Sequence, residues 1–223
     1  EEHCCAALTV DGEVYTWTDA DTEGSSFYRG PAFRNRTPEI ARGDMEGKRI
    51  KQIAVASRNG AGAIACVSED GQLFTWGAGG GGGLCHGDEL DVNAPRRVRF
   101  FDELPVQHVS FKSGRLGAVT AGGFLYISGV SDMDMNEIKQ THDHHWAEFV
   151  ACPCGEGTSR LSQRVGTPSR IHVDGRRFVL CATLHSRVAA VDDKGRVWSW
   201  GLEAGAQFLG HDGKFVDVPT KIS

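Results

Sequence analysis

The side chains best suited to bind a metal ion stand together between residues 142 and 154. Neutral imidazole and thiolate are good zinc ligands, and this stretch contains His142, His144, Cys152 and Cys154. The spacings His-x-His and Cys-x-Cys are not those of the common structural zinc sites. We therefore expect solvated histidines, unreactive thiols, no metal and no cofactor, with zinc on these four residues as the alternative.

A glycine-rich run after residue 76 suggests a second kind of chemistry, the binding of phosphate. Gly77, Gly79 and Gly82 have the Gly-x-Gly-x-x-Gly spacing that cradles a dinucleotide when a helix begins directly behind it. No helix is predicted there, and the Gly-Lys-Ser/Thr ending of a phosphate loop is missing. We interpret the run as a tight loop between two strands.

Covalent catalysis and nucleic-acid binding both lack their signatures. The sequence contains neither a Gly-x-Ser-x-Gly turn nor a His-Glu-x-x-His pair. Its 24 Lys and Arg against 29 Asp and Glu give a net charge of −5, whereas a nucleic-acid surface needs a basic excess. The one dense basic cluster, Arg96, Arg97 and Arg99, is too small to reverse that argument. The sequence favours a binding protein over an enzyme.

The cysteines and the apolar runs bear on where the protein is found. There are seven cysteines, an odd number with irregular spacing, which does not suit the disulfide framework of a short secreted chain. No apolar run approaches the roughly 18 residues of a membrane helix. We expect reduced thiols, no membrane contact, and a place in the cytoplasm or nucleus.

Four segments repeat one pattern: a strand of small residues, a tight turn, and a strand rich in aromatics. Each turn is predicted to need a glycine at positive φ, and these turn glycines are Gly12, Gly71, Gly123 and Gly195. Side chains alternate along a strand, so the aliphatic residues after the turns share one face: Val14, Leu73, Leu125 and Val197. The aromatic residues lie on the other face: Tyr15, Trp17, Phe74, Trp76, Tyr126, Trp198 and Trp200.

Two further strands per unit complete the repeat. One is predicted before the hairpin, over 50–56, 106–111 and 178–183. The other follows a proline, over 39–40, 96–100, 169–173 and 220–222, because proline is tolerated at the start of a strand. Four antiparallel strands per unit, repeated along a chain, are typical of propeller blades.

The second unit shows a recognisable motif. It reads Trp76-Gly-Ala-Gly-Gly-Gly-Gly-Gly-Leu-Cys-His-Gly-Asp88, followed by Pro95-Arg-Arg-Val98. This resembles the regulator-of-chromosome-condensation (RCC1-type) repeat, with its Trp-Gly-x-Gly, Leu-Gly-His-Gly and Pro-x-x-Val; Cys85 replaces the usual glycine. The fourth unit is similar, with Trp200-Gly201, Leu209-Gly-His211 and Pro219.

The resemblance implies an all-β fold, a β-propeller of four-stranded antiparallel blades. The resemblance also implies a ring of seven blades, which would need roughly 360 residues at about 52 per unit. Residues 1–223 are therefore expected to form a single partial propeller domain of about four blades. The first unit is entered midway, and further blades are expected outside this chain.

The third unit carries an insertion over residues 130–164. It spans 40 residues from Ser128 to Pro168, where the other units span 19 to 21. Long loops on rigid scaffolds often carry function, and this one is acidic and aromatic. Its candidate partner-binding residues are Asp132, Asp134, Glu137, His142, His144 and Trp146. An insert without a role is the alternative.

We therefore predict a protein-interaction scaffold with a protein partner. The resemblance implies an alternative, guanine-nucleotide exchange on a Ran-like small GTPase, because the family's namesake performs it. A third class is a propeller module within a larger protein, such as a ubiquitin ligase.

Overall fold

The computed structural model describes residues 4–18, 36–58, 61–129, 166–184, 187–201 and 216–222. These residues form four sheets in which every pair of neighbouring strands is antiparallel. The first sheet contains β1 (Cys4–Leu8), β2 (Val14–Thr18) and β3 (Glu39–Ile40). The second contains β4 (Ile50–Arg58), β5 (Ala61–Ser68), β6 (Leu73–Gly77) and β7 (Val92–Arg97).

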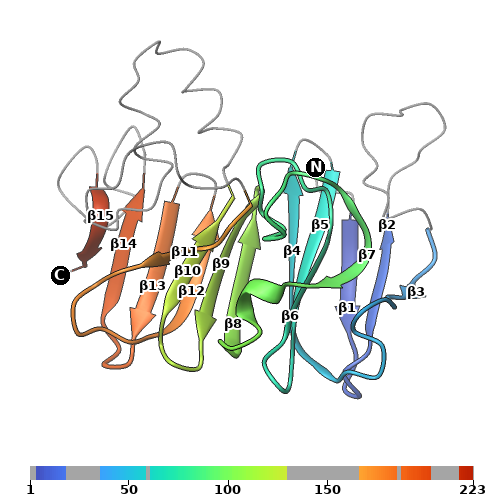
Figure 1. Ribbon diagram of the computed structural model, residues 1–223, viewed down its shortest axis with the longest axis horizontal. Helices are drawn as coiled ribbons and strands as arrows, with labels where there is room; N and C mark the ends of the chain where they lie inside the picture. The colour runs from blue at the N-terminus through green and yellow to red at the C-terminus, as the bar shows by residue number, and fades with distance from the viewer. Residues whose placement is uncertain are drawn as a thin grey trace, which may run out of the picture.

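The third and fourth sheets repeat the order of the second. The third contains β8 (Val106–Lys112), β9 (Arg115–Thr120), β10 (Leu125–Ser128) and β11 (Ser169–Ile171). The fourth contains β12 (Phe178–Leu184), β13 (Arg187–Asp192), β14 (Val197–Gly201) and β15 (Val216–Lys221). The four sheets stand side by side in chain order (Figure 1), and the first strand of each later sheet packs on the preceding one.

The all-β propeller architecture predicted from the repeats is confirmed. The described part of the first sheet has three strands where each later sheet has four, because no counterpart of β4 precedes β1 among the described residues. A seven-bladed ring stays a prediction, and so does the single-domain boundary at 1–223.

Two strands that were predicted to follow a proline, over 96–100 and 220–222, have different bounds in the structure. β7 starts at Val92 and β15 at Val216, so Pro95 and Pro219 lie inside edge strands. The pairing of β6 with β7 shifts between Thr75 and Gly77, and such a bulge on an edge strand tolerates the missing N–H of proline. The expected strand over 96–100 also ends early, because residues 99–101 form a short 3₁₀ helix.

The turn glycines occupy equivalent places in all four sheets. Gly12, Gly71, Gly123 and Gly195 have φ of 83°, 85°, 80° and 74°, as their turns were predicted to require. The carbonyl oxygens of the first three accept hydrogen bonds of 2.8–2.9 Å from the first strand of the following sheet. Each of these three turns therefore also joins its sheet to the next one.

A polar side chain three residues before each turn glycine closes the turn. Its oxygen accepts a hydrogen bond of 2.9–3.2 Å from the backbone N–H four residues later. The four residues are Thr9, Ser68, Thr120 and Asp192. Local hydrogen bonds of this kind satisfy a donor that the two-stranded ladder leaves open.

Three hydrophobic cores fill the spaces between the sheets. The aliphatic face of one sheet and the aromatic face of the next contribute to each core, as the alternation predicts. Leu73 belongs to the core shared with the third sheet, whereas Phe74 and Trp76 belong to the core shared with the first. Both faces of the second sheet are therefore buried, as are both faces of the third sheet.

The turn glycines permit a matched test of this packing. A Cβ on Gly71 would lie 2.8 Å from Cβ of Pro105, whereas a Cβ on Gly195 would have no described atom within 4 Å. Both glycines have positive φ, so each Ala variant pays about 1 kcal/mol of backbone strain. We expect Gly71→Ala to lose about 3 kcal/mol in total, because overpacking adds to the strain. Urea unfolding of both variants measures the difference, and equal losses would contradict the docking of the second turn on the third sheet.

Candidate protein-interaction surface

The predicted partner-binding residues Asp132, Asp134, Glu137, His142, His144 and Trp146 lie outside the described residues, as do Cys152 and Cys154 of the zinc alternative. In the described part of the chain, no three His, Cys, Asp or Glu side chains gather as metal ligands would. The partner-binding and zinc predictions both stay open.

The residues that flank the insertion are described, and they place its two ends on one loop. A Cβ on Gly129 would lie 2.8 Å from Cα of Gly83. The carbonyl of Gly166 accepts a hydrogen bond of 3.0 Å from the N–H of Gly87. Gly83 and Gly87 both belong to the connection over 78–91 between β6 and β7. We call this end of the sheets, opposite the turn glycines, the loop face.

The glycine-rich run is a tight loop, as expected. Gly77 ends β6, and two carboxylates already occupy backbone N–H groups of the loop that follows. Asp91 accepts from the N–H of Gly79 at 2.9 Å, and Glu89 accepts from the N–H of Gly81 at 3.1 Å. A phosphate would need such donors, so this loop is built around the protein's own carboxylates.

A cavity of about 250 Å³ lies beside this loop, between the second and third sheets. We call it the arginine groove. It is lined by Asp44, Cys85, His86, Gly87, Arg96, Arg97, Arg99, Phe100, Thr167 and Pro168. The basic cluster noted in the sequence therefore lines a recess together with residues of the preceding connection and the following sheet.

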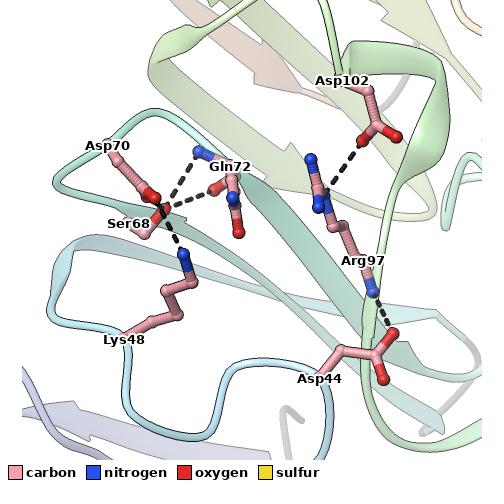
Figure 2. Close-up of polar contacts among 7 residues, drawn as sticks. All are labelled: Asp44, Lys48, Ser68, Asp70, Gln72, Arg97 and Asp102. Carbon is pink, nitrogen blue, oxygen red and sulfur yellow. Dashed lines mark hydrogen bonds and ion pairs between the residues drawn. The ribbon is translucent and has the colours of Figure 1, made fainter.

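Arg97 has a structural role at the edge of the groove (Figure 2). Its Nε lies 2.9 Å from a carboxylate oxygen of Asp102, and its backbone N–H donates to Asp44 at 3.0 Å. Both partners of the Arg97–Asp102 ion pair are more than a third exposed, so the pair contributes little to stability. The Asp102 carboxylate nevertheless balances the charge of the Arg97 guanidinium.

Arg96 and Arg99 differ from Arg97 in this respect. Among the described residues, neither guanidinium group has an ion pair or a hydrogen bond, and both residues are exposed. The electrostatic neighbour of Arg96 is His86. The groove therefore presents two guanidinium groups whose donors are not used within the described fold.

His86 forms the neutral polar wall of the groove. The hydroxyl of Thr75 donates to the carbonyl of Leu84 at 2.6 Å, so His86 Nε2, 3.0 Å away, must donate to that hydroxyl. Burial lowers the pKa of His86 below 6.5, and the charge of Arg96 lowers it further. The imidazole of His86 therefore makes a hydrogen bond within its own repeat. His211, at the matching position of the fourth unit, lies outside the described residues.

The sequence motif of the second unit, whose residues line the groove, also identifies the repeat family. A family model for the regulator of chromosome condensation (RCC1) repeat matches residues 70–111, from the turn of the second sheet to β8. The RCC1-type repeat recognised in the sequence is confirmed over this segment.

Relatives and solved structures agree with this assignment. Human E3 ubiquitin-protein ligase HERC2 is 36% identical over 111 residues, which are 49% of this chain and 2% of HERC2. The structure of human WBSCR16 matches with a TM-score of 0.70 at 17% identity, over 99% of this chain and 51% of that one. Prp20p from Saccharomyces cerevisiae matches with a TM-score of 0.57 at 17% identity, over 100% of this chain and 61% of that one. At these identities the two structures show the fold alone.

The RCC1-type pattern explains one substitution in this chain. Cys85 stands where the repeat usually has glycine, and its φ is 65°, in the left-handed region that favours glycine. Its thiol is buried, and burial raises its pKa to about 12. Burial also raises the pKa of Cys181 to about 12. Thiolate is the reactive form, so these two cysteines are packing residues.

Two features of the RCC1-type sheets were not predicted from the sequence. One is the polar residue three positions before each turn glycine, although an alignment of the units shows it at Thr9, Ser68, Thr120 and Asp192. The other is the place of the arginines, which were considered only as a possible nucleic-acid surface. They line one recess with Thr167 and Pro168, about 70 residues away in the sequence, and no local pattern indicates that.

Proposed function

We propose that this chain is a protein-interaction scaffold whose binding surface is the loop face, including the insertion over 130–164 and the arginine groove. One observation carries the proposal: both flanks of the insertion rest on the 78–91 connection, beside arginines that have no described partner. A partner that contacts the insertion would therefore meet the groove as well.

The cores between the sheets support this proposal. Each sheet is fixed to its neighbours by a continuous apolar core and by polar links such as the His108 Nε2 contact to the carbonyl of Cys181, at 2.8 Å. Rigid elements hold a binding surface in place and lower the entropy lost on association. His86, a side chain that could take part in acid–base chemistry, is engaged in a hydrogen bond within the fold.

The test is to replace residues 130–164 by a short Gly-Ser linker. Proteins captured from a lysate by the full chain and by the variant are then compared by quantitative mass spectrometry. We expect at least one protein to be retained by the full chain and reduced about tenfold by the variant, which corresponds to about 1.4 kcal/mol of lost binding.

The matched control replaces residues 19–35, the equivalent connection of the first unit. The control should retain the partner, and thermal melting should show that both variants stay folded. The proposal fails if the same proteins are recovered at undiminished levels without residues 130–164.

Nucleotide exchange on a Ran-like GTPase is the alternative. Prp20p has binding properties to Gsp1p and histones, but no described residue of this chain is assigned to exchange. Release of a fluorescent nucleotide from Ran distinguishes the two functions, since acceleration by micromolar protein would favour exchange over a passive scaffold.

The described residues contain no helix that could span a membrane. A place in the cytoplasm or nucleus is part of the proposal.

A further inference from the structure

We infer that the arginine groove binds the phosphate of a phosphorylated serine or threonine in the partner protein, held by the guanidinium groups of Arg96 and Arg99. The inference rests on the proposed function, since it names the chemistry of one group on the partner. It is carried by the position of two unpaired arginines in one recess.

The charge of the groove favours a single anion. Its three arginines face two carboxylates, Asp44 in the lining and Asp102 on Arg97 (Figure 2), which leaves one net positive charge. That charge lies at Arg96 and Arg99. Guanidinium groups offer a planar fork of donors that matches the oxygens of phosphate.

The size of the groove favours a side chain over a free nucleotide. Its volume of about 250 Å³ lies below the roughly 300–1,000 Å³ of sites for drug-sized ligands. Phe100, which is 40% exposed, and Pro168 add an apolar wall to the arginines. A phosphorylated side chain on an extended segment would meet both kinds of surface.

The surroundings of the groove disfavour a long polyanion. Asp88, Glu89 and Asp91 lie on the adjoining connection, and Glu103 follows Asp102. Nucleic acid and anionic membranes are bound by extended basic surfaces, and here acidic residues flank the basic ones on both sides in the sequence. One isolated phosphate on a protein segment fits this arrangement better.

A second cavity provides a comparison within the same molecule. It has a volume of about 320 Å³ and includes Arg170, Arg176 and Arg177 in its lining. The Arg170 guanidinium lies 3.8 Å from the ring centre of Phe124, and that of Arg176 lies 5.7 Å from the ring centre of Trp198. Because Arg170 and Arg176 already stack on aromatic rings, this cavity offers one arginine without a described side-chain partner, Arg177, whereas the arginine groove offers two.

The experiment uses the full chain and a degenerate peptide library with one fixed phosphoserine or phosphothreonine. The unphosphorylated library is the comparison, and the best retained sequence is resynthesised with fluorescein for anisotropy measurements. We expect retention of the phosphorylated library to exceed that of its twin at least about tenfold, because hydrogen bonds to charged groups are the strong ones. Inorganic phosphate should compete for the site.

The decisive variant is the double substitution Arg96→Ala/Arg99→Ala, which should lose at least about tenfold in affinity. It removes two exposed side chains, so its melting temperature should stay within about 2 °C of the parent. Arg42→Ala/Arg49→Ala is the matched control, since it removes the same charge from exposed arginines that pair with Glu46 and Glu69. The control should bind like the parent.

The inference would be overturned if Arg96→Ala/Arg99→Ala binds the phosphopeptide like the parent, if the control variant loses as much affinity, or if both libraries are retained equally. It would also be overturned by equal binding of a peptide with glutamate in place of the phosphorylated residue, or by binding of phosphatidylserine vesicles through Arg96 and Arg99. The proposed function would survive any of these if the 130–164 replacement still loses the partner. Conversely, phosphopeptide binding without an effect of that replacement would separate the groove from the insertion.

Discussion

Replacing Asp192 by alanine is expected to lower the free energy of unfolding by about 3 kcal/mol, because it removes one partner of a buried, charged hydrogen-bond network. Asp192 is 1% exposed. Its carboxylate accepts from the backbone N–H groups of Lys194 and Arg196 at 3.0 Å, from Arg196 Nε at 2.7 Å, and from Trp198 Nε1 at 3.1 Å. The variant leaves all of these donors without their acceptor.

The pKa of Asp192 gives this prediction a pH dependence. Burial would raise that pKa, but the hydrogen bonds from Arg196, Trp198 and Lys194 outweigh burial and lower it from 3.8 to about 2. A group with a lowered pKa stabilises the folded state above its unfolded value and loses that contribution as pH falls through the folded value. The shift is worth about 2 kcal/mol, so the gap between parent and variant should be constant above about pH 5 and shrink towards pH 2.

Urea unfolding from pH 7 to pH 2 measures this effect for the parent and for Asp192→Ala. Asp193→Ala is the matched control, because Asp193 is the exposed neighbour on the same turn. It should cost no more than about 0.5 kcal/mol. A gap between parent and Asp192→Ala that stays the same down to pH 2 would show that the network is not ionic.

Replacing Trp76 by alanine is expected to cost about 4 kcal/mol, the largest effect of any single substitution considered. Trp76 is 1% exposed and lies in the core between the first and second sheets. Truncation of a buried aromatic loses its transfer free energy and leaves a cavity that neighbours cannot fill. Thermal unfolding should shift downwards by roughly 8–16 °C for a chain of this size.

Trp17 provides the internal control for this prediction. It occupies the same repeat position in β2, but it is half-buried, because the face of the first sheet that carries it has no described sheet against it. Trp17→Ala should therefore cost about 1 kcal/mol, in line with a partly buried side chain. Equal losses at both positions would mean that the aromatic face of the first sheet is covered by residues outside the described part.

Local chemistry explains why so much of the fold could be predicted. A positive φ at Gly12, Gly71, Gly123 and Gly195 is a property of four consecutive residues, and the alternation of Leu73 and Phe74 is a property of one strand. The repetition of this local pattern in four units then predicts the propeller architecture, because each unit can bury its faces only against another unit. The ends of β7 and the 3₁₀ helix at 99–101 were missed, since edge pairing and bulges depend on neighbouring strands.

By itself, the sequence determined the fold family, the repeat turns and the surplus length of the third unit. Only the tertiary structure decided that Arg96 and Arg99 share a recess with His86 and Pro168, while Arg97 pairs with Asp102. The physical reason is that charge pairing and recess shape depend on distances between units, and residues 96 and 168 come together only when two sheets pack. The alternation of side chains within a strand carries no information about that contact.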